Sequence, residues 1–247
     1  GPVLQKYTIK DAIRDQTVLG FQTEYMKPEF RQGGKEVTGL DDSYYNRRDH
    51  RLSVLNTILN LCGEKLGFTN GLGKSYEGML TVDSIPHAQE YYSLLKEIKA
   101  GVSEVKIDSD ILRRLPDFPK FAITYSVSEN EGRSIADQQR MKESLDDYNT
   151  MFGTRFDLDQ IRAYNTELSD RLARKQGKYK VRSEQLDLVI VVDRLLTGFD
   201  APCLSTVFVD RNVMKPHEII QMFSRTNRLF DQKKAAGQIV TFRDPDH

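Results

Sequence analysis

The chain has 247 residues, of which 38% are apolar, and its 36 basic and 36 acidic side chains give a formal net charge of zero. This length suits one large α/β domain, or one domain with an appendage. Zero net charge excludes a global attraction to nucleic acid, so any DNA contact must come from a local cluster. Two cysteines, Cys62 and Cys203, are too few for a disulfide framework or a zinc site.

No apolar stretch approaches the roughly 20 residues that cross a bilayer, and the first residues lack the pattern of a signal peptide. We therefore expect a cytoplasmic protein that does not bind membranes. Gly1-Pro2 has the form of a protease-cleavage remnant, so we expect an excised piece of a longer protein.

Residues 1–50 are polar and mixed, and we expect a lead-in with short strands or extended pieces, followed by one domain over 51–247. In chain order, apolar periodicity and short apolar runs predict a helix over 51–62, a strand over 77–83, a helix over 85–100, a strand over 120–126, a helix ending near Phe152, a helix over 159–175, strands over 186–192 and 206–210, a helix over 216–228 and a strand over 238–242.

This alternation of strands and helices predicts βαβ units and a parallel sheet, which places ligand sites at the carboxyl ends of the strands. Ser84 is expected there, as the N-cap of a helix that has Pro86 in its first turn. The turn 197–200 and the loop after Asp210 are expected at the same edge.

The turn 197–200, Thr-Gly-Phe-Asp, directly follows the apolar run 186–193. Backbone N–H groups in such a turn can hold a phosphate, and glycine allows a close approach. Gly198 and Asp200 are therefore candidates for nucleotide binding. An ordinary strand-to-helix turn is the alternative.

The segment 221–228 reads Gln-Met-Phe-Ser-Arg-Thr-Asn-Arg, and its spacing of three would place Arg225 and Arg228 on neighbouring points of one helix face. A guanidinium supplies fixed charge and forked donors to a phosphate during its transfer. Gln221 precedes both arginines on the same side. A solvated helix end is the alternative, because arginine also complements the helix dipole.

Gly73-Lys74-Ser75 is not a phosphate loop, because the pattern needs glycine five positions before Gly73, where Phe68 stands. The sequence also lacks an acidic strand end of the Asp-Glu-x-x type, which holds magnesium in such enzymes. We conclude that this chain is not a complete ATPase, and we find no metal-ligand spacing among its histidines, cysteines and carboxylates.

The stretch 171–182 contains six cations and no acid. Neutralising phosphates would release counterions and favour DNA binding at low salt. From this stretch the DNA-binding candidates are Arg174, Lys175, Lys178, Lys180 and Arg182, and a solvated surface is the alternative.

Together, the segments 191–202 and 221–228 resemble the motor subunit of type I restriction enzymes, and the segments 9–21, 79–92 and 147–152 resemble further parts of it. The similarity spans nearly the whole chain. One departure is Arg194, which stands where an apolar residue or Met is expected and could add a DNA contact or an ion pair between domains.

The resemblance implies an α/β fold of RecA-like type, the second lobe of a superfamily-2 helicase motor, within an ATP-dependent double-stranded DNA translocase and endonuclease. It implies that Arg228 is an arginine finger, with Arg225 and Gln221 beside the nucleotide, and that Ser84, Thr197 and Gly198 lie near the DNA backbone or the lobe interface. ATP and Mg²⁺ would be held mainly by a first lobe that this chain lacks, so the chain alone would be inactive.

The partners implied by the resemblance are double-stranded DNA, the first lobe and the nuclease domain of the same subunit, and the methylation and specificity subunits of a bacterial or archaeal complex. Two alternatives remain open at this point. The chain could be a catalytically inert scaffolding or DNA-binding domain, or a lobe of another superfamily-2 helicase.

Overall fold

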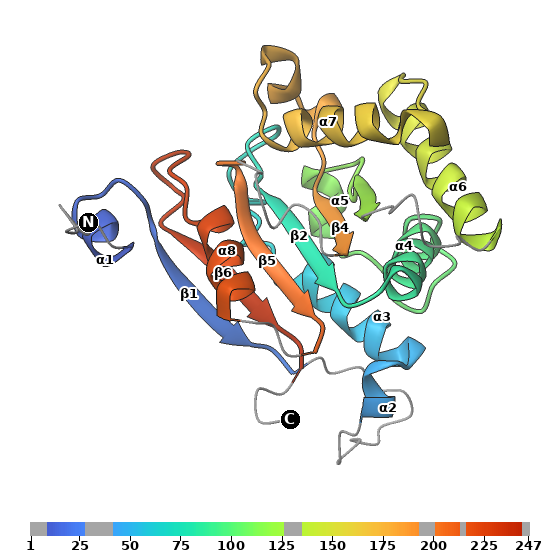
Figure 1. Ribbon diagram of the computed structural model, residues 1–247, viewed down its shortest axis with the longest axis horizontal. Coiled ribbons are helices and arrows are strands. Elements are labelled where there is room, and N and C mark those ends of the chain that lie inside the picture. The colour runs from blue at the N-terminus through green and yellow to red at the C-terminus, as the bar shows by residue number, and fades with distance from the viewer. Residues whose placement is uncertain (1–8, 28–41, 126–134, 193–200, 213–215, 244–247) are drawn as a thin grey trace, which may run out of the picture.

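The computed structural model describes residues 9–27, 42–125, 135–192, 201–212 and 216–243. Its centre is a six-stranded sheet of order β1-β6-β5-β2-β4-β3, in which all neighbouring strands are parallel (Figure 1). The strands are β1 (Gly20–Tyr25), β2 (Glu77–Val82), β3 (Phe121–Tyr125), β4 (Leu188–Val192), β5 (Leu204–Asp210) and β6 (Ala236–Thr241). The predicted parallel sheet flanked by helices is confirmed.

The α-helices are α1 (Ile9–Arg14), α2 (Asp42–Tyr45), α3 (Arg48–Asn56), α4 (Ile85–Lys99), α5 (Ser109–Arg114), α6 (Ile135–Phe152), α7 (Ile161–Leu172) and α8 (Pro216–Thr226). A π-helical turn, η1 (Thr57–Leu61), extends α3, and short 3₁₀ turns occupy η2 (Leu158–Gln160), η3 (Gly177–Lys180) and η4 (Arg182–Glu184). No helix in the described ranges is long and apolar enough to cross a membrane.

The core is built on β2, β3, β4 and β5, whose residues are all buried. Successive side chains of a strand point to opposite faces, so complete burial means that both faces of these strands are covered. Helix α4 packs against β3 and β4, and α8 packs against β5 and β6. This explains why β4 is a short continuous apolar run and why β2, β3 and β5 do not alternate between buried and exposed residues.

Strand β1 lies inside the segment that the sequence assigns to a lead-in, yet it completes one edge of the sheet. It pairs with β6 from Gly20, opposite Ala236, to Tyr25, opposite Thr241. In Figure 1 these two strands lie side by side although they come from opposite ends of the sequence. The segment before residue 51 therefore contributes an edge strand to the domain, and this strand is largely exposed.

Local signals fix several helix ends. The Ser84 side chain accepts a hydrogen bond from the backbone N–H of His87, and Pro86 lies in the first turn of α4, as predicted. Gly153 follows α6 with a φ of 67°, a left-handed conformation that favours glycine. Helix α7 ends at Leu172, earlier than predicted, and Arg174 there has a φ of 49°.

Because all strands are parallel, their carboxyl ends meet at one edge of the sheet and their amino ends at the other. Helix α8 connects the end of β5 to the start of β6, so its own end lies toward the amino edge. Close packing there depends on Gly237 of β6, since a Cβ at this position would lie 2.3 Å from the Thr226 hydroxyl. The fold therefore places Ser84 and the end of α8 at opposite edges.

Candidate functional site

The carboxyl edge carries a buried polar network centred on Asp210, the last residue of β5. Its carboxylate lies 2.9 Å from His50 Nε2, and it accepts hydrogen bonds from Arg243 Nε at 3.0 Å and from the Tyr91 hydroxyl at 2.5 Å. Arg243 also reaches Asp83 through Nη2, at 3.3 Å. The network thus ties the ends of β2, β5 and β6 to α3 and α4.

The charge balance of this network favours an ionised Asp210. Burial alone would raise the pKa of this carboxyl. The hydrogen bond and charge of His50, the charge of Arg243 and the Tyr91 hydroxyl oppose burial and lower the pKa to about 2. Asp210 is thus an anionic anchor for the strand ends, and at 2% exposure it is closed to a bulky ligand.

Ser84 lies at this edge, one residue beyond Asp83, and is only partly buried. The backbone N–H of His87 donates to its hydroxyl at 3.4 Å, which satisfies one donor at the start of α4. A helix N-terminus favours anions through its N–H groups and its dipole. Ser84 can therefore face a phosphate without leaving its capping position.

Helix α8 is shorter than predicted, and the prediction that both arginines share one helix face is wrong. The helix ends at Thr226, so Arg225 lies in its last turn and Arg228 lies beyond it. Asn227 is buried, and its carbonyl accepts a hydrogen bond from the Leu19 N–H at 2.7 Å, a contact that directs the chain out of the helix. Gln221 and Arg225 remain four apart on one helical face.

Arg228 is exposed, but its backbone is fixed from the interior by Lys234. The Lys234 ammonium donates to the Arg228 carbonyl at 3.0 Å and to the Pro202 carbonyl at 2.6 Å. Lys234 is only 3% exposed, and burial lowers its pKa to about 8. One buried cation thus joins the end of the 191–202 segment to the end of the 221–228 segment.

The structure places the arginines of the basic stretch in the interior. Arg174 donates to Glu77 at 3.3 Å and to the Ser75 carbonyl at 2.7 Å. Arg182 forms two hydrogen bonds to Asp187, at 2.5 and 2.8 Å. A DNA contact by either arginine would require these pairs to open, because a buried charge that loses its partner is strongly unfavourable.

The predicted lysines of the stretch lie on the surface instead. Lys175 is exposed and pairs with Asp170 at 2.8 Å, a contact of the weak, solvent-screened kind. The Lys178 ammonium lies 4.6 Å from the centre of the Tyr179 ring, and Lys180 is exposed. These three cations therefore lie on the outside of the segment that the buried arginines hold in place.

Thr197, Gly198 and Asp200, together with Arg194, lie outside the described residues, and their roles stay predictions. Within the described part of the chain, no group of three or more His, Cys, Asp or Glu side chains could hold a metal ion. The structure thus brings Pro202, Lys234 and Arg228 together at one edge of the sheet and keeps Ser84 at the other.

Sequence reasoning missed Lys234 and the Asp210 network. Lys234 is the second of two adjacent lysines in a polar loop, and nothing in that pattern indicates that one of them is buried. Asp210 carried a signal, because a charged residue that ends an apolar run of a buried strand needs a partner. Its partners His50, Tyr91 and Arg243 are distant in sequence and could not be identified.

The sheet order and the helices on its faces define an α/β domain with an all-parallel sheet. The family model for domain 3 of the type I restriction enzyme subunit R matches residues 74–244. The chain belongs to this family.

Curated relatives agree with this assignment. The type I restriction enzyme SauCOLORF180P endonuclease subunit of Staphylococcus aureus (strain COL) is 29% identical over 250 residues, which are 99% of this chain and 25% of the relative. The SsaAORF53P endonuclease subunit of Staphylococcus saprophyticus is 32% identical over 251 residues, again 99% of this chain and 25% of the relative. The chain thus spans about a quarter of the length of these relatives.

Among solved structures, a fragment of an HsdR subunit of a type I restriction enzyme from Vibrio vulnificus YJ016 is 15% identical, with a TM-score of 0.46 over 100% of this chain and 38% of that chain. The ATP-dependent type ISP restriction-modification enzyme LlaBIII bound to DNA is 13% identical, with a TM-score of 0.46 over 96% of this chain and 13% of that chain.

Proposed function

We propose that this chain is the second, RecA-like motor lobe of a type I restriction enzyme R subunit, an ATP-dependent translocase on double-stranded DNA. In the complete enzyme it completes an ATP site whose phosphate loop and Mg²⁺ lie in the first lobe. Its other partners are the nuclease domain of the same subunit and the methylation and specificity subunits. The isolated chain is inactive in hydrolysis.

The observation that carries this proposal is the placement of Arg228. Its side chain is exposed while its backbone is flanked by two hydrogen bonds, from the Leu19 N–H to Asn227 and from the Lys234 ammonium to Arg228 itself. A guanidinium that acts across an interface must be accessible and also pre-positioned, because reorganisation during the reaction would add to the barrier. Arg228 is thus the proposed finger, with Arg225 and Gln221 behind it on α8.

DNA contact is proposed for Ser84 and for the exposed lysines Lys175, Lys178 and Lys180, with Thr197 and Gly198 added on the basis of sequence alone. Arg174 and Arg182 are proposed to act indirectly, by holding the lysine-bearing segment through Glu77 and Asp187. Gly198 and Asp200 remain the proposed nucleotide contacts of the 197–200 turn.

The test is DNA-stimulated ATP hydrolysis by the full-length subunit, compared between the wild type and Arg228→Ala, with duplex binding followed in the same samples. Loss of an arginine finger lowers turnover on the order of 10³–10⁵-fold in known NTPases. We expect hydrolysis to be lost and duplex binding to be retained. Arg113→Ala, at a side chain 76% exposed on α5, is the matched control. Unchanged hydrolysis in Arg228→Ala would favour the inert scaffolding role.

A further inference from the structure

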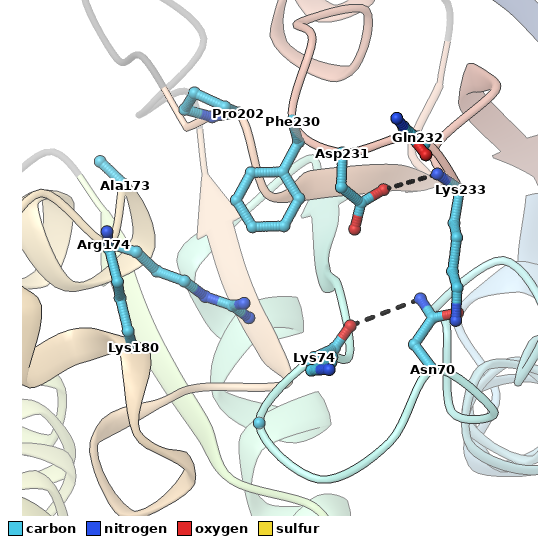
Figure 2. Close-up of a pocket in the computed structure, with 11 residues that line it drawn as sticks. Asn70, Lys74, Ala173, Arg174, Lys180, Pro202, Phe230, Asp231, Gln232 and Lys233 are labelled. Atoms are coloured by element: carbon cyan, nitrogen blue, oxygen red, sulfur yellow. Dashed lines mark hydrogen bonds between the residues drawn. The ribbon is translucent and has the colours of Figure 1, made fainter.

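A cavity of about 740 Å³ opens at the amino edge of the sheet and is separate from the Ser84 edge. Its walls come from segments that precede three strands: Lys74 before β2, Pro202 before β5, and 230–233 before β6. Ala173 and Arg174, which directly follow α7, close another side (Figure 2). Volumes of this size are typical of sites for small organic ligands.

The cavity is lined by more positive than negative charge. Lys74, Lys180 and Lys233 are exposed at its rim, and Arg174 contributes a guanidinium from the interior. Asp231 is the one acid among the lining residues that the structure describes. Its carboxylate already accepts hydrogen bonds from the Tyr76 hydroxyl at 2.9 Å and from two backbone N–H groups, those of Lys233 at 3.0 Å and Lys234 at 2.8 Å. The cavity therefore favours an anion.

An aromatic ring stands in the same cavity. Phe230 is 39% exposed, and Figure 2 shows its ring projecting between Arg174 and Asp231. The Arg174 guanidinium lies 5.7 Å from the ring centre, and Tyr76 meets the ring edge-on at 6.1 Å. These contacts hold the ring in place and leave part of it open. Pro202 and Ala173 add apolar surface on the adjoining wall.

We propose that this cavity binds a phosphorylated nucleoside, with the base against Phe230 and the phosphate among Lys74, Lys180 and Lys233. A flat ring in a cavity lined by several cations matches a ligand that joins an aromatic base to an anionic group. The ligand is either a free nucleotide or the phosphorylated end of a nucleic-acid strand, because both present this chemistry. Arg228 is not among the described residues that line the cavity, so substitution of Arg228 tests the proposed arginine finger without removing a residue of this site.

The chain contains no tryptophan, so Phe230→Trp introduces a single tryptophan, whose fluorescence reports on the cavity. The 247-residue chain carrying this substitution is titrated separately with AMP, inorganic pyrophosphate and a 5′-phosphorylated single-stranded oligonucleotide. We expect AMP or the oligonucleotide to quench the fluorescence saturably, whereas pyrophosphate does so weakly or not at all. Quenching by AMP alone identifies a free nucleotide, and quenching by the oligonucleotide alone identifies a strand end.

Phe21→Trp is the matched control, because Phe21 is 38% exposed and lies on β1, away from the cavity. Binding measured by calorimetry should weaken on the order of 10- to 100-fold in Phe230→Ala, the range expected when a base loses its stacking partner. It should also weaken in Lys180→Ala. Equal quenching in the Phe21→Trp control, or AMP affinity unchanged in Phe230→Ala, would overturn the proposal. Pyrophosphate binding as tight as that of AMP would do the same.

Discussion

Lys234 holds the backbone of Arg228, with its ammonium nitrogen 3.0 Å from the Arg228 carbonyl oxygen. The same nitrogen lies 2.6 Å from the carbonyl oxygen of Pro202. The position of the exposed arginine therefore depends on a buried lysine in the approach to β6 as well as on the end of α8. This lysine joins two segments that are separate in sequence and that the proposed function places at one nucleotide interface.

The substitution Lys234→Met should show whether Lys234 positions Arg228 or only stabilises the fold. Methionine keeps the apolar stem and removes the donor to both carbonyls, while it also removes the cost of burying an ammonium whose pKa is lowered to about 8 by that burial. We expect stability in urea unfolding to fall by at most about 1 kcal/mol, because the two effects offset each other. In the full-length subunit we expect ATP hydrolysis to fall clearly.

Lys120→Met provides the control for this prediction. Lys120 is 5% exposed, and its ammonium also donates to backbone carbonyls, those of Arg182 and Ser183, away from Arg228. It should leave hydrolysis intact at a similar cost in stability. Equal hydrolysis by the two lysine variants would show that Lys234 does not position the arginine.

Asp210→Asn should reduce the acid sensitivity of the fold. The folded pKa of Asp210, about 2, lies below the ordinary 3.8. The contribution of the ionised Asp210 carboxylate to folding stability is therefore complete at pH values above its pKa in the unfolded chain. This contribution is lost as the pH falls through its pKa in the folded protein. From pH 6 to pH 3 the wild type should lose about 1 kcal/mol more stability than Asp210→Asn. Urea unfolding of both proteins at the two pH values measures this, and a constant difference between them would contradict the Asp210 assignment.

Two substitutions at Ser84 distinguish capping from DNA contact. Ser84→Asp preserves the N-cap and places a favourable negative charge at the start of α4, so stability should be retained. Ser84→Ala should cost about 1 kcal/mol. If Ser84 faces the DNA backbone, duplex binding should weaken in Ser84→Asp because of charge repulsion, despite its intact fold. Duplex affinity equal to that of the wild type in Ser84→Asp would exclude the contact.

Replacing Lys175, Lys178 and Lys180 together by glutamine should weaken duplex binding and its dependence on salt. The slope of log affinity against log salt concentration should become shallower by about 0.9 for each phosphate that the variant no longer neutralises. Fluorescence anisotropy over a range of salt concentrations gives this slope. Lys142, Lys96 and Lys106, which are exposed on other parts of the surface, provide the matched triple substitution. The same slope in both triple variants would show that duplex DNA does not contact Lys175, Lys178 and Lys180.

The sheet was predictable because its signals are local. The run that forms β4 is continuously apolar, as expected of a strand covered on both faces, and Ser84 with Pro86 marks the start of α4. Short strands were expected among residues 1–50, but the place of β1 in the sheet was not predicted, because its residues are largely exposed and its position depends on pairing with β6, at the far end of the sequence.

The candidate site was only partly predictable for the same reason. Arg225 and Arg228 were identified from their spacing, but the helix ends between them, where the Leu19 N–H contacts Asn227. Arg174 and Arg182 were grouped with the exposed lysines because charge in a sequence does not reveal burial. Glu77 and Asp187, which pair with them, lie on or beside buried strands.

Chemical rescue tests most directly whether Arg228 supplies a guanidinium to ATP held by another lobe. Hydrolysis by the full-length, DNA-bound Arg228→Ala subunit is measured at saturating ATP with increasing ethylguanidinium at millimolar concentrations. We predict very low activity without the additive and a saturable partial recovery with it, with no stimulation of Lys234→Met or Arg113→Ala. Hydrolysis by Arg228→Ala at the wild-type rate without the additive would contradict the assignment of Arg228 as the finger.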